Sequence, residues 1–441
     1  MKRFISILAT AAMLLALVVP AFASEYSDHR IINMSNAHTN TEFYTSKDAE
    51  PDPDDPAIAN YDQAIARYNA YQEAAARYNA EIHFDSTNMA GATQSLSNSA
   101  MAATPDYDFY YNDMQVAIPA ALSGYAVALE SFIPADDDIW TDQSVLTPIK
   151  LPGQDATYLF KPSGINFGAF TLGYNKTLLD AKGLADPQEL YAKGQWTWEA
   201  WRQMLLALTE DTDGDGAIDV YGYSGFWTWF LEGMLMSNAA AIAGGPTQTL
   251  DSPQTIEVLE FVNTIYNVDK TAMPWNDDWG SNNQFKNGNI GFFIACSWIL
   301  NDDPNAAGYD LRVVPFPCGP SGDPATNKGV NLTGNVFLIP KNCDDPYRVY
   351  MMLKDTIDWF QGDVDLRDGD LDWLADQLEG EENMEITLDM SSRLNFDIWN
   401  SINEGGTFSI VPMTRGEQTP AQVSEAYKNF YQAQLDAYFS K

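Results

Sequence analysis

The fold is decided by the stretch Phe170-Thr-Leu-Gly-Tyr-Asn-Lys176 and by Trp196-Thr-Trp-Glu-Ala-Trp201, which follows it along the chain. The first lies in a β-type run from Phe167 to Tyr174 and predicts a strand. The second begins a helix, because the Thr197 hydroxyl can cap the first turn. Apolar residues then recur at helical spacing, which places one face in a core: Trp198, Trp201, Leu205 and Leu208.

Strands and helices alternate along most of the chain. Further β-type runs lie at Arg30–Met34, Glu81–Asp85, Tyr107–Tyr111, Ile290–Ile294, Leu311–Pro315 and Asn335–Ile339. Helices are expected from about Ala57 to Ala80 and after Ser252, Asp345 and Thr419. Each of the last three residues precedes a proline, which is tolerated at the first helical position. The alternation predicts an α/β fold with mostly parallel strand pairing.

The N-terminus has the pattern of a secretory signal peptide. Lys2 and Arg3 precede an apolar run from Phe4 to Val19, and Pro20-Ala-Phe-Ala23 supplies an Ala-x-Ala cleavage signal. The run is shorter than the roughly 18 apolar residues of a membrane-spanning helix, which argues against an anchor. We therefore expect an exported protein, periplasmic or extracellular, whose mature chain begins at Ser24. No cysteine lies near the cleavage site, so no lipobox cysteine is expected.

The chain is strongly acidic. It has 441 residues and a formal net charge of −37, with 45% hydrophobic residues. This length allows two or more domains. A surface of such charge repels nucleic acid and anionic membranes, so neither is expected as a partner. The three cysteines, Cys296, Cys318 and Cys343, are odd in number and widely spaced. We expect free buried thiols rather than a disulfide framework, with a Cys318–Cys343 bridge as the alternative.

Several segments, taken in order, resemble one protein family. These are Phe170–Lys176, Lys182-Gly-Leu184, Trp196–Trp201, Asp211–Asp219 with Tyr221-Gly-Tyr223, Phe285–Phe293 with Ser297-Trp298, and Tyr309–Gly319. They resemble the motifs of family-1 extracellular solute-binding proteins of ABC importers, the maltose-binding-protein type. The similarity extends from about residue 80 to residue 360. Residues 25–80 and 362–417 match the pattern poorly.

The resemblance implies two α/β lobes that hold a sugar in the cleft between them and close by a hinge motion. Residues 24–165 with 311–360 would form lobe 1, and 166–310 with 361–441 would form lobe 2. The hinge would lie near Ser163–Gly168 and Ala307–Leu311. The expected protein is a monomeric receptor, not an enzyme, that needs no cofactor. It would deliver a sugar or oligosaccharide to a membrane-embedded ABC permease.

Sugar binding makes two chemical demands. Aromatic rings stack on the apolar C–H face, whereas carboxylates, amides and hydroxyls bind the rim. On lobe 1 we expect Asp113, just past a strand end, with Asn88, Thr333 and Asn335 as comparable polar candidates. On lobe 2 the aromatic candidates are Trp227, Trp229, Trp275, Trp279 and Trp298, of which Trp298 matches a ligand-facing tryptophan of the family.

An acidic loop has the spacing of a Ca²⁺ site. Asp211, Asp213, Asp215 and Asp219 stand at loop positions 1, 3, 5 and 9, and Ala217 offers its carbonyl at position 7. Position 12 is Gly222 instead of a bidentate Glu, so the ligand set is incomplete. The alternatives are a structural Ca²⁺ site and a solvated Asp-Gly turn.

Two other classes of function are alternatives to a sugar receptor. A secreted glycoside hydrolase needs two carboxylates in a cleft, which any acidic chain can supply, but no spacing here identifies such a pair. A Ca²⁺-dependent carbohydrate-binding surface protein rests on the acidic loop alone. The three histidines, His29, His38 and His83, form no metal-ligand pair, and nucleophile-elbow, P-loop and dinucleotide-binding motifs are absent from the sequence.

Overall fold

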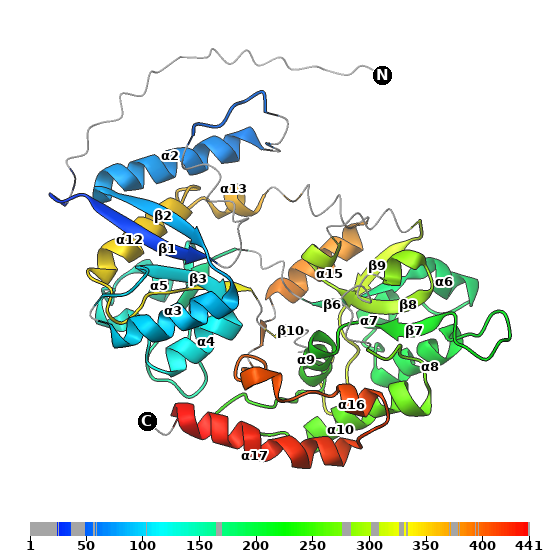
Figure 1. Cartoon of the computed structure of the whole chain (residues 1–441). Helices are drawn as coiled ribbons and strands as arrows, with labels where there is room; N and C mark the ends of the chain where they lie inside the picture. Colours follow the sequence, from blue (N-terminus) through cyan, green and yellow to red (C-terminus); the bar gives the residue numbers. More distant parts are fainter. Residues whose placement is uncertain are drawn as a thin grey trace, which may run out of the picture.

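The computed structural model has two main β-sheets, one in each of two lobes, and a small two-stranded sheet among its described residues (Figure 1). It describes residues 24, 26–36, 49–55, 58, 60–102, 104–164, 170–275, 284–300, 308–325, 330–331, 334–369, 371, 378, 380–392, 394–395 and 397–439. The expected α/β class is confirmed. The expected signal peptide, residues 1–23, lies outside the described residues.

The sheet of lobe 1 has the strand order β2-β1-β3-β11-β5-β4. These strands are β1 (Arg30–Asn36), β2 (Ala80–Ser86), β3 (Phe109–Asp113), β4 (Leu146–Ile149), β5 (Leu159–Pro162) and β11 (Asn335–Leu338). β1 pairs with β2 and with β3 in parallel, whereas β11 pairs antiparallel with both β3 and β5, and β4 antiparallel with β5.

Helices cover both faces of this sheet. One face carries α2 (Tyr61–Tyr78) and α12 (Pro346–Ile357), which pack against each other; the other carries α3 (Met89–Met101) and α4 (Met114–Leu122) (Figure 1). Polar residues begin several of these helices: the side chains of Asn60, Asn88 and Asp113 each accept a backbone N–H from the first turn. Short helices η1 (Leu129–Ser131) and α5 (Asp138–Thr141) precede β4, and α13 (Val364–Asp368) follows α12.

The sheet of lobe 2 has the order β7-β8-β6-β9. Its strands are β6 (Thr171–Asn175), β7 (Tyr221–Ser224), β8 (Ile290–Ala295) and β9 (Leu311–Val314). The surrounding helices are α6 (Lys176–Ala181), α7 (Pro187–Ala192), α8 (Trp198–Leu208), α9 (Trp227–Ser237), α10 (Pro253–Asn263), η2 (Thr264–Val268), α11 (Ser297–Leu300) and α15 (Glu381–Ser392). All residues of β6 and β8 are buried, and Trp198 and Trp201 lie in the core as expected.

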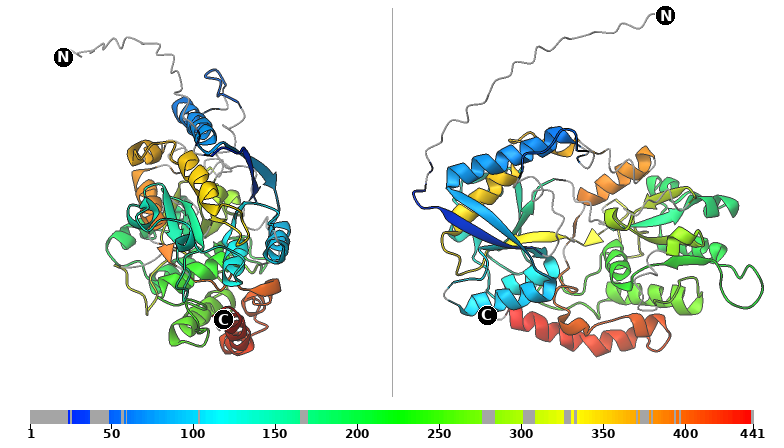
Figure 2. Two further views of the ribbon diagram at one scale, coloured as in Figure 1. Left: turned by 90° about the vertical axis from the view of Figure 1, so that its left-hand side faces the viewer. Right: turned by 45° about the horizontal axis from the view of Figure 1, so that its top comes forward.

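The chain crosses between the lobes several times. The short strands β10 (Val330–Asn331) and β12 (Leu394–Asn395) pair in parallel. The last elements, η5 (Glu404–Gly406), α16 (Val411–Thr414) and α17 (Pro420–Phe439), run below both lobes (Figure 2). α17 packs against α10 of lobe 2, and its Phe439 ring lies close to Gly153 of lobe 1.

The expectation of mostly parallel pairing is wrong. β6 pairs antiparallel with both β8 and β9, and among the described strand pairs of that sheet only β7–β8 is parallel. Apart from β4–β5, the antiparallel pairs involve β6 or β11, which enter their sheets after crossing from the other lobe. β9 lies in the sheet of lobe 2, although the expected division assigned residues 311–360 to lobe 1. Of the expected hinges, Ser163–Gly168 is described only at residues 163 and 164, and Ala307–Leu311 only from Gly308 onward.

Two further observations concern the chain as a whole. None of the described helices is both long and apolar enough to cross a membrane. The three cysteines are free, and Cys296 and Cys318 are buried, so the alternative of a Cys318–Cys343 bridge is excluded.

Candidate functional site

The expected polar residues of lobe 1 meet at one end of its sheet. β1 and β3 end there and β11 begins there, so that Asn335 lies directly opposite Asp113. Asn36, the last residue of β1, pairs with Tyr111 of β3. Ligands of open α/β sheets bind outside the carboxyl ends of the strands. The strand register therefore brings together Asp113 and Asn335, which the sequence offered as two separate candidates.

Asp113 and Asn88 also have a structural task. One Asp113 carboxylate oxygen accepts the N–H of Gln115 at 2.7 Å, and the Asn88 side-chain oxygen accepts the N–H of Gly91 at 2.8 Å. Each therefore caps the helix that follows its strand, α4 and α3 respectively. A cap of this kind stabilises a helix by about 1 kcal/mol. A substitution at either position would change the stability of the lobe as well as its polar edge.

Sequence reasoning missed Asn112 and Ser35. Asn112 is 1% exposed, and within the described residues neither its amide nitrogen nor its carbonyl oxygen has a hydrogen-bond partner; the buried Ser35 hydroxyl has none there either. The register places Ser35 beside Tyr110, so Ser35 and Asn112 lie on the α3/α4 face of neighbouring strands. Buried polar groups normally have partners, so these two positions stand out. Ser35 and Asn112 are distant in the sequence, and the pairing of β1 with β3 brings them close together.

A polar cavity of about 420 Å³ lies between α3 and the strands β1 and β2 of lobe 1. Its lining includes Thr87 and Gly91, which flank the predicted residue Asn88. It also contains the carboxylates of Asp85 and Asp106, and the latter accepts a hydrogen bond from the Ser95 hydroxyl at 2.8 Å. The remaining lining residues are Asn33 and Tyr107.

Three of the predicted tryptophans converge around one phenylalanine of lobe 2. The Phe226 ring lies 4.8 Å from Trp229, 5.0 Å from Trp275 and 6.0 Å from Trp227, measured between ring centroids. Phe226 and the two α9 tryptophans are partly exposed, whereas Trp275 is buried. We call Phe226, Trp227, Trp229 and Trp275 the aromatic cluster. Figure 1 shows α9, which carries two of its members, on the side of lobe 2 that faces lobe 1.

Neighbouring residues fix the aromatic cluster in place. The Trp229 ring stacks on Phe170 at 4.9 Å, with an angle of 20° between the planes. Trp227 lies 6.2 Å from the buried Trp399. The Trp275 carbonyl accepts a hydrogen bond from Arg415 at 2.9 Å. Phe170 is the residue before β6, and Trp399 belongs to the C-terminal segment, so distant parts of the chain support the same surface.

A buried carboxylate organises the C-terminal part of this support. Asp397 is 3% exposed and accepts the N–H groups of Ile242 at 2.6 Å, Ala243 at 2.8 Å and Trp399 at 3.2 Å. Its bonds join the loop after α9 to the segment that supplies Trp399. Burial raises the pKa of Asp397 to about 6, although the three N–H bonds oppose the shift. Sequence reasoning did not single out Asp397.

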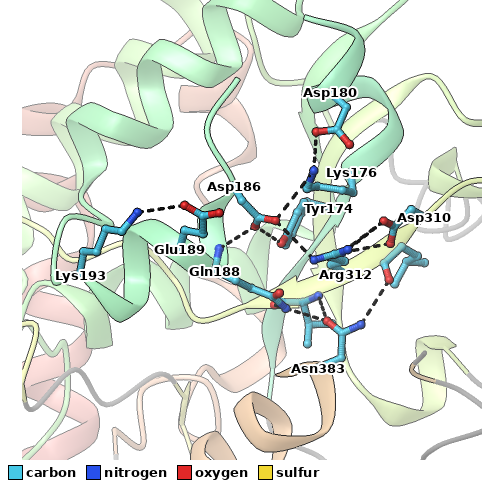
Figure 3. A network of polar contacts seen from close by, with 12 residues as sticks. Tyr174, Lys176, Asp180, Asp186, Gln188, Glu189, Lys193, Asp310, Arg312 and Asn383 are labelled. Atoms are coloured by element: carbon cyan, nitrogen blue, oxygen red, sulfur yellow. Dashed lines mark hydrogen bonds and ion pairs between the residues drawn. The ribbon is translucent and has the colours of Figure 1, made fainter. Parts of the chain in front are cut away.

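A polar network lies along β9, the edge strand of the lobe 2 sheet, and covers that edge (Figure 3). The Asn383 side-chain oxygen accepts the N–H of Val313 at 3.0 Å and that of the Gln188 amide at 2.8 Å. The Asn383 amide nitrogen donates to the Leu311 carbonyl at 3.5 Å. Asp186 accepts the Tyr174 hydroxyl at 2.6 Å, which ties α7 to β6.

The acidic loop forms a compact exposed turn. One carboxylate oxygen each from Asp211, Asp213 and Asp215 lies within 4.8 Å of the others. Asp211 accepts the N–H of Gly214 at 2.7 Å and of Gly216 at 2.8 Å. Asp215 accepts the N–H of Ala217 at 2.7 Å, and Asp219 accepts both the N–H and the hydroxyl of Thr212. The three converging carboxylates suit a hard cation, and Asp219 is not part of this convergence.

Three of the predicted ligand residues cannot be placed. Trp279 and Thr333 lie outside the described residues, and of Trp298 only the backbone, within α11, is described. The first lobe therefore contributes Asn88, Asp113 and Asn335 from the predicted set, and the second contributes Trp227, Trp229 and Trp275.

Two lobes, each with its own sheet, and chain crossings between them define the class of two-lobed α/β binding proteins. The family model of bacterial extracellular solute-binding proteins matches residues 63–349 of this chain. The chain belongs to this family, which is a family of binding proteins rather than enzymes. No curated protein sequence matches the chain significantly.

Solved structures share the fold at low sequence identity. An ABC substrate-binding protein from Listeria monocytogenes in complex with cycloalternan is 16% identical, with a TM-score of 0.62 over 92% of this chain and 99% of that one. A maltose/maltodextrin-binding domain from Bdellovibrio bacteriovorus bound to maltotriose is 15% identical, with a TM-score of 0.57 over 92% and 98%. A receptor from Streptomyces glaucescens, solved unliganded and with acarbose, is 17% identical, with a TM-score of 0.57 over 92% and 99%.

Proposed function

We propose that this solute-binding protein captures a sugar or oligosaccharide between its lobes and delivers it to a membrane-embedded ABC permease. The observation that carries the proposal is the aromatic cluster on the lobe-facing side of lobe 2. Phe226, Trp227 and Trp229 offer partly exposed, rigid ring surfaces that suit the C–H faces of sugar rings. Opposite them, the Asp113–Asn335 edge offers oxygen and amide groups that suit sugar hydroxyls.

The ligands of the structural neighbours support the same class. Cycloalternan, maltotriose and acarbose are named for three of them. The remaining predicted residues, Trp279, Trp298 and Thr333, belong to the proposed ligand site on sequence grounds. We infer a monomer without catalytic activity or required cofactor, exported by its N-terminal signal and free of a lipid-anchoring cysteine.

A thermal-shift screen against neutral sugars and oligosaccharides tests this proposal. A ligand that binds only the folded protein raises the unfolding midpoint, in proportion to the logarithm of its concentration once binding is saturated. We expect at least one oligosaccharide to raise the midpoint and to remain intact after incubation with the protein. Cleavage of that oligosaccharide would favour a glycoside hydrolase, and a screen without any stabilising carbohydrate would contradict the proposal.

For the acidic loop we propose one Ca²⁺, bound by Asp211, Asp213 and Asp215, with the Ala217 carbonyl and Asp219 completing the shell. The support is the convergence of the three carboxylate oxygens within 4.8 Å. Such an ion would brace the turn before β7 and would have no chemical role in ligand binding. Calorimetric titration of metal-free protein with Ca²⁺ should give one binding event that is lost in Asp213→Asn. A flat titration of the unchanged protein would remove the site and leave a solvated turn.

A further inference from the structure

Lys161 is the third residue of β5. The register pairs Phe160 with Phe337 and Leu159 with Leu338, so Lys161 lies beside Val336 one position further along. Because antiparallel partners share a face, Lys161 lies on the same face as Leu159 and Val336, both fully buried. Val336 in turn pairs with Asn112. Lys161 and Asn112 therefore flank Val336 on one face, one position from the Asp113–Asn335 edge.

Lys161 lacks the carboxylate partner that several other cations in the described part of this protein have. Lys161 is partly buried, and in the described part of the chain its side chain has neither an ion pair nor a hydrogen bond. Burial alone lowers its pKa, without an opposing carboxylate. Several other cations that are not fully exposed lie against carboxylates: Arg30 with Asp108, Arg202 with Asp269, Arg312 with Asp310, Arg348 with Asp28, and Lys354 with Asp137.

This isolation is unusual for such an acidic sequence. The chain has 61 acidic residues and 24 lysines and arginines, so a carboxylate partner is easily provided. Removing an ammonium group from water without a partner is unfavourable. The same face also holds the buried Asn112 amide, and neither of its polar atoms has a hydrogen-bond partner among the described residues. The partly buried Lys161 and this amide lie on β5 and β3, on either side of β11 and one position from the proposed ligand edge.

We propose that Lys161, together with Asn112 on the other side of β11, binds an anionic group of the ligand, so that the receptor takes an acidic carbohydrate. The inference rests on the proposed function and specifies its substrate class. A carboxylate or a sulfate on the sugar would supply the negative charge that Lys161 lacks, and the Asn112 amide would donate a second hydrogen bond. Charge-assisted hydrogen bonds of this kind are stronger than neutral ones, more so away from water.

The net charge of −37 does not oppose such a ligand at close range. At physiological ionic strength the screening length is about 8 Å, so the long-range field mainly slows the approach of an anion. An ammonium group that the ligand contacts directly is screened far less. We therefore expect association of the acidic ligand to become faster as salt is added, while the neutral ligand shows no such trend.

Calorimetry on the full mature chain tests the inference, with three probes: a neutral oligosaccharide, an oligosaccharide of uronic acids, and a sulfated oligosaccharide. We expect one of the two acidic probes to bind more tightly than the neutral one, and which of them does so identifies the anion. Lys161→Met should weaken the acidic probe by about tenfold or more and leave the neutral one unchanged. Lys161→Arg should restore part of the loss, and the exposed Lys150→Met is the matched control.

The unliganded variant gives an independent readout. If Lys161 has no structural partner, Lys161→Met should leave the unfolding midpoint unchanged or raise it, because an unpaired buried charge is removed. Equal binding of acidic and neutral probes, or acidic binding that survives Lys161→Met, overturns the inference and leaves the proposed sugar receptor standing. Failure of all three probes to bind contradicts both.

Discussion

At the residue scale, two tryptophans of the aromatic cluster should respond differently to truncation. Trp229 is partly exposed and stacked on Phe170, whereas Trp275 is 5% exposed. Trp229→Ala should lower sugar affinity by about tenfold with a small change in stability. Trp275→Ala should lower the free energy of unfolding by about 3 to 5 kcal/mol, because it leaves a cavity. Calorimetry and denaturant titration separate the effects, and the reverse pattern would place the ligand surface elsewhere.

Asp397 should make stability depend on pH. Its pKa in the folded protein is about 6, above the value of about 4 in the unfolded chain. The folded state therefore binds the proton more tightly, so the contribution of Asp397 to stability is greatest below pH 4 and declines as the pH rises to 6. The decline should be on the order of 2 to 3 kcal/mol.

The measurement for Asp397 is the free energy of unfolding at several pH values between 4 and 7. In Asp397→Asn this component of the pH dependence should disappear. The variant should also be less stable throughout the range, because one amide oxygen replaces a carboxylate that accepts three N–H groups. An unchanged pH profile in the variant would show that Asp397 stays ionised throughout.

At the residue level, the sequence offered candidates where the signal is local. Trp227 and Trp229 are close in the chain and lie at the start of one helix, and Asp113 is the last residue of a recognisable strand. Lys161, Asn112 and Asp397 were missed because their isolation or support depends on strands and loops that are distant in sequence. No local pattern distinguishes Lys161 from an ordinary exposed lysine of a short strand.

At the scale of elements, Asn383 acts as a substitute strand. β9 is an edge strand, and the Asn383 amide bonds to the Val313 N–H and the Leu311 carbonyl, which are groups that a neighbouring strand would pair. This contact attaches α15 to the sheet and closes an edge that could otherwise pair with another chain.

We expect Asn383→Ala to lower the free energy of unfolding by about 1 to 3 kcal/mol, because it leaves buried backbone groups unpaired. Hydrogen exchange at the Val313 amide should accelerate by more than the global change explains. The matched control is Asn287→Ala, at an exposed asparagine bonded to Gln284, where the change should be within about 0.5 kcal/mol. Equal effects of the two substitutions would mean that the β9 edge does not depend on Asn383.

Element boundaries followed the sequence better than strand direction did. Thr197 caps α8 as expected, and α10 begins after Ser252 as expected, because helix starts depend on a few neighbouring residues. The prediction of mostly parallel pairing failed because the alternation of strands and helices does not record which strands arrive after crossing between lobes. β6 and β11 are such strands, and each pairs antiparallel with both neighbours.

At the scale of the whole molecule, the chain crossings and α17 connect two separate sheets. α17 packs against α10 and reaches Gly153 of lobe 1 through Phe439 (Figure 2). A hinged pair of lobes of this kind closes when a ligand contacts both, and the energy of closure comes from contacts made only in the closed state. The central claim is therefore that a carbohydrate binds between the lobes and draws them together.

Small-angle X-ray scattering of the mature protein, with and without the oligosaccharide that gives the largest thermal shift, tests this claim most directly. We expect a smaller radius of gyration at saturating ligand. The molecular mass in solution should stay that of a monomer, and the oligosaccharide should be recovered intact. Trp229→Ala should require more ligand to reach the same contraction. Saturable binding without any contraction, or contraction accompanied by cleavage of the oligosaccharide, would contradict a receptor that holds its sugar between closing lobes.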